Sequence, residues 1–393
     1  MKKTLFLFSL VLVLGLSFHV SSYAQCDSKT GRNVITGAYC LNSISTAVPF
    51  LRIAPDARGA ALGDAGIATS PDANAMHYNA SKLAFSQDDM GISVTYTPWL
   101  RALGLNDVYM AYLSGYKKID DFQVIGASLR YFSLGSIQFT DTDGNLLQVG
   151  NPNELEVNVA YARKLTDNFS ASVSGKFIYS DLASGQQLPG QAGETIEAGI
   201  AGAADFGLTY QAPVRIGDTK SNLRAGLAIS NIGNKMTYTN STKRDFLPAN
   251  IGLGVAWEFN LDNYNTITLI ADFNKLLVPS PDSTGALNYD ASVIGGALGS
   301  FSDAPFGAGE ELREVYMSYG LEYWYDQQFA IRAGYFHEHA SKGNRKFLTL
   351  GIGVKYNIFG LDISYLVPTT NQQNPLDNTL RFSMSFDIGA MGS

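Results

Sequence analysis

Few residues of this chain are of the types that perform acid–base, nucleophilic or metal chemistry. Beyond residue 24 there are three histidines, His77, His337 and His339. His337 and His339 would share one face of a strand end, which permits a metal pair, but neither a cysteine nor a convincing third ligand stands nearby. The sequence has no G-x-S-x-G nucleophile elbow and no Gly-rich phosphate loop followed by Lys-Ser/Thr. We therefore expect no catalytic, cofactor-binding or metal-binding residues, and no cofactor.

Closely spaced carboxylates are the other feature that could indicate acid–base chemistry. Glu154 lies near Glu156, and Glu194 lies near Glu197. We interpret both pairs as lumen and loop carboxylates of the fold described below rather than as an acid and a base. The expected protein is therefore not an enzyme.

The two cysteines, Cys26 and Cys40, point to a structural role. A C-x-x-C redox or zinc motif is absent. In an oxidising compartment the two thiols are expected to pair. The disulfide would close a loop of about 15 residues, which is worth roughly 3 kcal/mol in the chain-entropy model.

The amino terminus predicts export from the cytoplasm. Two lysines precede an uncharged apolar run from Leu5 to Phe18, and Ser22-Tyr23-Ala24 predicts cleavage after Ala24. The apolar run is too short to be a membrane anchor. Gln25 stands where a lipobox needs a small residue, so we do not expect Cys26 to be lipidated. We assign residues 1–24 to a signal peptide.

The composition favours a membrane barrel over a soluble domain. Charged residues make up 16% of the chain, against roughly 25% in ordinary soluble domains. After the signal peptide no window approaches 18 uncharged apolar residues. Without the signal peptide the chain has 26 basic and 35 acidic residues, a net charge of −9, so it has no nucleic-acid footprint. Few charges, many aromatics and no spanning helix are typical of an outer-membrane β-barrel.

Period-2 alternation along the chain predicts the strands. In the segment 347–356 one face carries large apolar residues and the other carries Thr349, Gly351, Gly353 and Lys355. Segments 250–259 and 379–388 repeat the pattern. Because the second face holds small and polar residues rather than dense Lys and Glu, we interpret it as the lining of a lumen.

Fourteen antiparallel strands are expected, so the fold class is an all-β transmembrane barrel. The strands are expected near 89–97, 107–116, 122–135, 154–164, 168–181, 198–210, 222–231, 249–260, 264–274, 312–325, 329–339, 346–357, 359–367 and 378–388. Connections alternate between short turns and long loops, apart from 211–221, which could hide a longer hairpin. We expect the turns and both termini to be periplasmic and the long loops to be extracellular.

Residues 25–87 do not alternate and are expected to form a partly helical segment before the barrel domain, 88–393. Ser70-Pro71-Asp72 is typical of a helix start, which predicts a short helix over 72–76. This segment could plug the lumen or lie in the periplasm as a tether. A second short helix is expected near 290–299, within a long connection, 275–311, that could bind a partner or cap the lumen.

A family resemblance rests on this segment. Phe50-Leu51, the run from Pro55 to Gly66 (PDARGAALGDAG) and the run from Met76 to Ala84 (MHYNASKLA) resemble the opening of the PorV/PorQ family, and within it the PorV (LptO) branch. The start is also similar to that of FadL-type barrels, although Asn79-Ala80-Ser81-Lys82 lacks their proline. The family belongs to the type IX secretion system of Bacteroidetes, so the resemblance implies a FadL-like outer-membrane barrel without enzymatic activity.

The resemblance also implies partners. Members accompany the giant translocon barrel Sov, called SprA in relatives, where they receive secreted proteins through a C-terminal signal domain. They pass this cargo to an attachment complex with PorU, PorQ and PorZ. Contact with outer-membrane lipid and lipopolysaccharide is expected as well. Two alternatives stay open: a FadL-like channel for hydrophobic small molecules, and an outer-membrane protein linked to lipid A deacylation.

One loop is a candidate contact for partners. The predicted extracellular loop 98–106 is unusually apolar and combines residue types common at binding hot spots. The candidate partner- or cargo-binding residues are Trp99, Leu100, Arg101, Leu103 and Leu105. The loop could instead fold over the mouth of its own barrel.

Overall fold

The computed structural model describes residues 26–27, 29–100, 104–140, 144–187, 195–217, 219–240, 242–370 and 379–389. The chain divides into two compact units, Met1–Cys40 and Leu41–Ser393. The predicted signal peptide, Arg101, Leu103 and Glu194 lie outside the described residues. Among the residues described, no helix is both long and apolar enough to cross a membrane.

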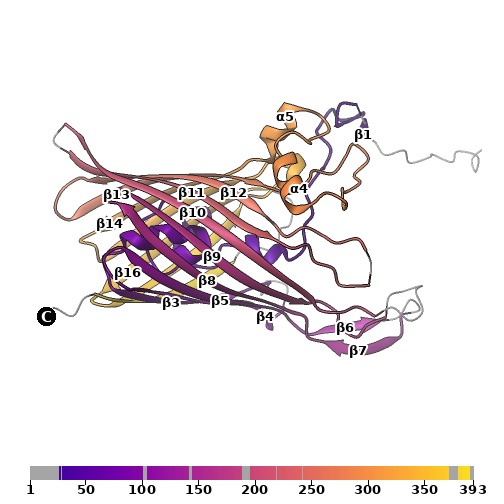
Figure 1. The fold of residues 1–393 in the computed structure, drawn as a ribbon, viewed down its shortest axis with the longest axis horizontal. Coiled ribbons are helices and arrows are strands. Elements are labelled where there is room, and N and C mark those ends of the chain that lie inside the picture. The colour runs from indigo at the N-terminus through magenta and orange to yellow at the C-terminus, as the bar shows by residue number, and fades with distance from the viewer. Residues whose placement is uncertain are drawn as a thin grey trace, which may run out of the picture. The chain divides into compact units, whose positions relative to one another are not determined.

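Fourteen antiparallel strands of the second unit form a closed barrel, as predicted (Figure 1). Each strand pairs with its neighbours along the chain, and the last strand pairs with the first. The strands are β3 (Met90–Pro98), β4 (Val108–Lys118), β5 (Gln123–Leu134), β8 (Asn153–Thr166), β9 (Phe169–Asp181), β10 (Gly199–Ile216), β11 (Thr219–Gly233), β12 (Asn250–Asn260), β13 (Asn265–Leu276), β14 (Tyr316–Tyr325), β15 (Phe329–His337), β16 (Lys346–Tyr356), β17 (Phe359–Pro368) and β18 (Leu380–Ile388).

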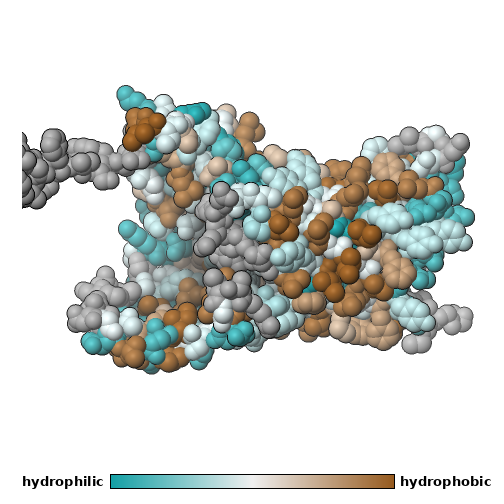
Figure 2. All heavy atoms as spheres, turned by 180° about the vertical axis from the view of Figure 1, so that it is seen from behind, coloured by the Kyte–Doolittle hydropathy of each residue, from teal (hydrophilic) through white to brown (hydrophobic). Residues whose placement is uncertain are grey.

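The two faces of each strand follow the alternation in the sequence. In β16, Leu350 and Ile352 are 57% and 55% exposed on the outer wall, while Thr349, which faces the plug in the lumen, is 1% exposed. Figure 2 shows hydrophobic side chains gathered over this wall. Arg130, Arg332 and Arg381 are among the largest fully buried side chains of the chain, and all three belong to strands. This fold therefore has an apolar exterior and a polar interior, as a barrel in lipid requires.

The strand boundaries depart from the prediction at two places. The connection 211–221 is not a loop, because β10 and β11 continue to pair as far as Ile216 and Thr219. β14 begins at Tyr316 rather than near residue 312, because the preceding residues form the helices α5 (Ala308–Glu311) and η4 (Leu312–Glu314). Neither difference changes the number of strands.

The connections divide the barrel into two unlike ends. At one end, which we call the short-turn mouth, the strands are joined by turns of two to four residues at 119–122, 167–168, 217–218, 261–264, 326–328 and 357–358. At the other end, the long-loop mouth, every connection has at least eight residues. It holds the helix α4 (Val293–Gly299), close to the helix expected at 290–299, α5, η4 and η5 (Ala340–Lys342). It also holds a hairpin that was not expected, β6 (Ile137–Thr140) with β7 (Leu146–Gly150).

Residues 41–87 of the second unit precede β3, and we call them the plug because most of them, from Ala47 on, lie inside the barrel. They form η1 (Pro49–Arg52), α2 (Ala57–Ala61), α3 (Ala75–Tyr78) and η2 (Ala80–Phe85), which Figure 1 shows in indigo within the barrel strands. Asp56 caps α2 by accepting a hydrogen bond from the Gly59 amide at 2.7 Å. The helix expected over 72–76 begins at Ala75 instead, because the Asp72 carboxylate accepts a hydrogen bond from the Asn74 amide before the helix starts.

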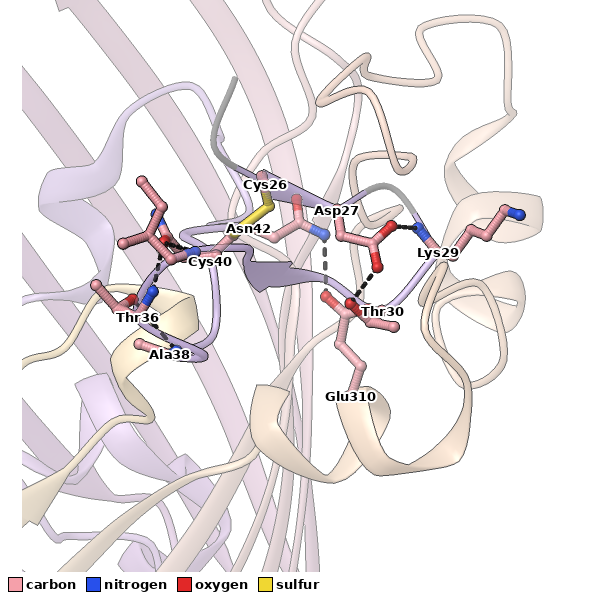
Figure 3. The surroundings of a disulfide bond; sticks show 11 residues. Cys26, Asp27, Lys29, Thr30, Thr36, Ala38, Cys40, Asn42 and Glu310 are labelled. Atoms are coloured by element: carbon pink, nitrogen blue, oxygen red, sulfur yellow. Dashed lines mark hydrogen bonds between the residues drawn. A yellow bond between two sulfur atoms is a disulfide. The ribbon is translucent and has the colours of Figure 1, made fainter. Parts of the chain in front are cut away.

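The first unit is small and carries the disulfide. Two strands of two residues each, β1 (Cys26–Asp27) and β2 (Arg32–Asn33), pair antiparallel. The prediction of a segment without strands was therefore wrong at these four residues. The disulfide between Cys26 and Cys40 closes the unit around this hairpin (Figure 3).

Candidate functional site

A buried ion-pair network fastens the plug to the barrel wall. Arg58 on α2 donates from Nε and Nη2 to the two carboxylate oxygens of Glu322, at 2.9 and 2.8 Å. It also donates from Nη1 to Asp72 at 2.8 Å, within the plug. Arg332 shares Glu322 at 2.7 Å and pairs with Asp362 at 2.6 Å. The network thus joins the plug to β14, β15 and β17.

A second anchor uses the main chain of the plug. Arg130 on β5 donates from Nη1 to the carbonyl oxygens of Phe50, Leu51 and Ile53, at 3.1 to 3.4 Å. Its Nη2 lies 2.6 Å from Nδ1 of His77. Because a guanidinium can only donate, this contact requires an unprotonated Nδ1 on His77. His77 is therefore a packing partner in the lumen, and its role here is structural.

The middle of the plug is held by two further strand side chains. The Asp272 carboxylate accepts hydrogen bonds from the amides of Gly66 and Ile67, at 2.7 and 2.9 Å. Thr349 accepts from the Gly63 amide and donates to the Ala61 carbonyl, both at 2.9 Å. These strands therefore recognise backbone amides and carbonyls of the plug.

The space left in the lumen is polar. A chamber of about 80 Å³ lies between the plug and the wall, lined by residues such as Arg52, Asp64 and Asn274. A vestibule of about 600 Å³ lies at the short-turn mouth, with Arg224 and Asp387 among its lining residues. Neither cavity offers the continuous apolar surface that a hydrophobic small molecule would need.

The other titratable candidates have ordinary partners. His339 Nδ1 lies 2.9 Å from the Ser341 hydroxyl at the start of η5. His337 Nδ1 lies 3.3 Å from the Tyr335 hydroxyl. Glu154 accepts from Ser180 at 2.8 Å, and Glu156 lies 3.5 Å from Arg130 in the lumen. In the part of the chain that the structure describes, no group of three or more His, Cys, Asp or Glu residues is placed to hold a metal ion.

The long loops are braced against one another by charged side chains. Lys342 on η5 donates to Glu310 at 2.6 Å and to Glu314 at 3.0 Å, and Lys275 pairs with Glu314 from the end of β13. Burial alone would raise the pKa of the Glu310 carboxyl, but hydrogen bonds from Lys342 and Asn42 outweigh it and lower the pKa below its usual value. The 277–315 connection is therefore a fixed part of the mouth.

The helix α4 in that connection buries its small residues and exposes its large apolar ones, the reverse of an ordinary surface helix. Its inner side consists of small residues: Ala297 is buried, and a Cβ on Gly296 would meet Phe246 and Pro279 at 3.1 Å. Its large apolar side chains point outward, with Ile294 60% exposed and Leu298 71% exposed. Phe301, just after the helix, is 52% exposed. We call Ile294, Leu298 and Phe301 the α4 patch. Exposed apolar clusters of this kind are more common at contact surfaces than elsewhere on a protein, so the α4 patch is a candidate contact surface.

Of the candidate residues in loop 98–106, the structure describes Trp99, Leu100 and Leu105. Trp99 is buried, with its ring 5.1 Å from that of Phe132, and Leu100 packs against the same cluster. Leu105 is 42% exposed. The burial of Trp99 fits the alternative in which the start of this loop folds over the mouth of its own barrel. The α4 patch was missed, because periodicity could predict a helix near 290–299 but not which face would be covered.

The first unit, taken by itself, is organised around its disulfide. Asp27 accepts hydrogen bonds from the Lys29 amide and the Thr30 hydroxyl, at 2.9 and 2.8 Å (Figure 3). The Cys40 amide donates to the Gly31 carbonyl at 2.9 Å. At the opposite turn Ile35 is 77% exposed. The contacts favour a closed loop with an accessible tip.

Comparison with known proteins gives one match by sequence and several by structure. The family model described as "Type IX secretion system protein PorV" matches residues 38–283. No curated protein sequence matches the chain. The toluene transporter TodX of Pseudomonas putida is 11% identical, with 86% of this chain and 99% of that chain covered and a TM-score of 0.47.

Two further solved structures resemble this chain to a comparable degree. The toluene transporter TbuX of Ralstonia pickettii is 11% identical over 85% of this chain and 96% of that chain, with a TM-score of 0.43. A FadL homologue of Pseudomonas aeruginosa is 12% identical over 88% of this chain and 100% of that chain, with a TM-score of 0.41. The likeness to these three structures is one of fold.

Proposed function

The chain belongs to the PorV family of type IX secretion system proteins, and from this premise we propose that it binds secreted cargo and hands it on without performing a chemical step. In this proposal the cargo is recognised through its C-terminal signal domain at the giant translocon barrel Sov/SprA. The barrel then delivers the cargo to the attachment complex that contains PorU, PorQ and PorZ. The long-loop mouth faces the cell exterior, and the short turns and the C-terminus face the periplasm.

The α4 patch is the observation that carries the proposal. The lumen is occupied by the plug, so binding surfaces have to be sought outside it. At the long-loop mouth, Ile294 and Leu298 expose large apolar side chains on a loop that ion pairs hold in place. Rigid, exposed apolar residues suit protein recognition, because little entropy is lost when a partner covers them. Leu105, the exposed member of loop 98–106, is a second candidate contact.

The test is recovery of partners from native outer membranes. We would replace Ile294 and Leu298 together by Ser in a tagged chain and quantify the co-purified translocon barrel and secreted cargo by mass spectrometry. The matched control replaces Leu146 and Leu147 by Ser, since these side chains are 74% and 50% exposed on the β6–β7 hairpin. Heat-modifiable migration on gels establishes that each variant is a folded barrel.

The expected result is a loss of cargo or translocon of tenfold or more in the α4 variant and little loss in the hairpin control. Undiminished recovery of both partners in the α4 variant would remove the patch from the binding surface. Recovery of the unmodified barrel alone, with bound fatty acid, would contradict the proposal itself and favour a channel for hydrophobic small molecules. Neither outcome depends on an enzymatic assay.

A further inference from the structure

The first residues of the plug lie at the long-loop mouth. The Asn42 amide donates to the Ser341 carbonyl at 2.7 Å, in the β15–β16 connection. The Asn42 side chain donates to Glu310 at 2.9 Å, in the β13–β14 connection. The Ala47 amide donates to the Phe246 carbonyl at 2.9 Å, in the β11–β12 connection. Three separate long loops thus hold this stretch at one end of the barrel.

The last residues of the plug lie at the opposite mouth. The Lys118 side chain, at the end of β4, donates to the Gln87 carbonyl at 3.2 Å. Asp89 then hydrogen-bonds to Ile388, the last residue of β18, at 3.1 Å. The plug therefore ends beside the C-terminal strand, at the short-turn mouth.

Between its ends the plug folds back on itself within the lumen, since Arg130 contacts both the Phe50 carbonyl and His77, and Arg58 reaches Asp72. Its wall contacts change along the chain from Arg130 near residue 50, to Glu322 at Arg58, to Ser170 at Ser81. Ser86 finally meets Tyr116 near the end of β4. Plug residues such as Leu62 and Leu83 are almost fully buried along this path.

From this path we infer that the amino-terminal residues leave the barrel at the long-loop mouth, on the opposite side from the C-terminus. This takes the place of the expectation that both termini are periplasmic. Peptide bonds join Leu41 to the disulfide-closed loop 26–40, so that loop is tethered at the same mouth whatever orientation it adopts there. In an outer membrane with the long loops outside, the mature amino terminus is presented at the cell surface. The inference rests on the course of the plug and is independent of cargo binding.

Epitope accessibility on intact cells tests the inference. A short epitope would be inserted after Ile35, in the exposed turn of the disulfide-closed loop. One reference epitope is inserted after Ser283, in an exposed part of a long loop, and another after Asn263, in a short turn. Antibody binding is compared before and after the outer membrane is permeabilised. Heat-modifiable migration and an intact disulfide establish that each insertion is tolerated.

The epitope after Ile35 is expected to behave like the one after Ser283, with at least tenfold more binding on intact cells than the epitope after Asn263. Binding that follows the Asn263 epitope would overturn the inference. The comparison holds for either orientation of the barrel, because it asks only which reference the amino terminus resembles. It therefore fails separately from the proposed function, which partner recovery tests.

A cross-link provides the second measurement. In a chain with Cys26 and Cys40 replaced by Ser, we would introduce Asn42→Cys with Ser341→Cys, whose backbones are hydrogen-bonded. The control pair is Asn42→Cys with Gln328→Cys, in a short turn. A mobility shift under oxidising conditions is expected for the first pair in most of the folded barrel and not for the control. Cross-linking of the control pair alone would place residue 42 at the wrong mouth and overturn the inference.

Discussion

The replacement Arg58→Met tests whether the ion-pair network fastens the plug. Methionine keeps much of the apolar stem but removes the guanidinium that hydrogen-bonds to Glu322, Asp72 and Ser70. Removing one partner of a buried ion pair costs about 3–5 kcal/mol, because a charge is left uncompensated. Glu322 would still be paired with Arg332, and the vestibule admits water near Arg58. We therefore expect Arg58→Met to lower the free energy of unfolding by about 3 kcal/mol, the low end of this range. This corresponds to a factor of roughly a hundred in the ratio of folded to unfolded protein.

The assay is urea unfolding of the barrel in lipid vesicles, followed by tryptophan fluorescence. The matched control is Lys355→Met, because the Lys355 side chain is 38% exposed and its pair with Asp387 should contribute less than about 1 kcal/mol. A double-mutant cycle with Glu322→Gln isolates the pair itself. The reasoning would be refuted if Arg58→Met lowered the free energy of unfolding no more than Lys355→Met does. A coupling energy between Arg58 and Glu322 below about 0.5 kcal/mol would refute it as well.

Three further predictions follow from single contacts. Because the pKa of Glu310 lies below its usual value, its bond to Lys342 stabilises the mouth at neutral pH and is lost only in acid solution, below the ordinary range of a glutamate. Protease resistance of 277–315 should therefore persist from pH 7 to pH 5, fall in more acid solution, and vary less with pH in Glu310→Gln. Replacing Cys26 and Cys40 by Ser should make the first unit protease-sensitive, a change worth about 3 kcal/mol, while the urea midpoint of the barrel stays the same. Gly63→Ala should lower the free energy of unfolding of the barrel by about 1–2 kcal/mol or more, and with it the urea midpoint, since Gly63 has φ +70° and a Cβ there would meet the Tyr335 backbone at 2.8 Å.

The barrel could be predicted from the sequence because its strands obey a local rule. Outer-wall residues such as Leu350 and Ile352 recur at every second position, and the lipid outside requires that pattern at every strand. The lengths of the connections then predict which end of the barrel carries the long loops, as the structure shows. The stretch 211–221, which could have hidden a further hairpin, only lengthens the hairpin of β10 and β11, so the number of strands stays at fourteen.

The site could not be predicted in the same way, because its elements are placed by contacts between distant parts of the chain. The apolar loop that begins near Trp99 is compatible with a partner contact and with a fold over the barrel mouth, and the burial of Trp99 depends on Phe132 of another strand. Whether Leu298 or Ala297 faces outward on α4 depends on Phe246, which lies in another connection. The course of the plug depends on partners such as Asp272, more than 200 residues away in sequence. No window of sequence contains these pairings.

The way the wall holds the plug also bears on whether the lumen could serve as a route for apolar molecules. Asp272 is matched to two plug amides and Arg130 to three plug carbonyls. A hydrocarbon has neither group to offer, so one that displaced the plug would leave these buried side chains without partners, at a cost of about 1–3 kcal/mol for each unsatisfied group and more for a charge. A translocated apolar substrate would therefore have to pass a wall whose side chains are placed to bind peptide groups. The same wall is well suited to holding a peptide segment, and through it the loops of the mouth, in one fixed arrangement.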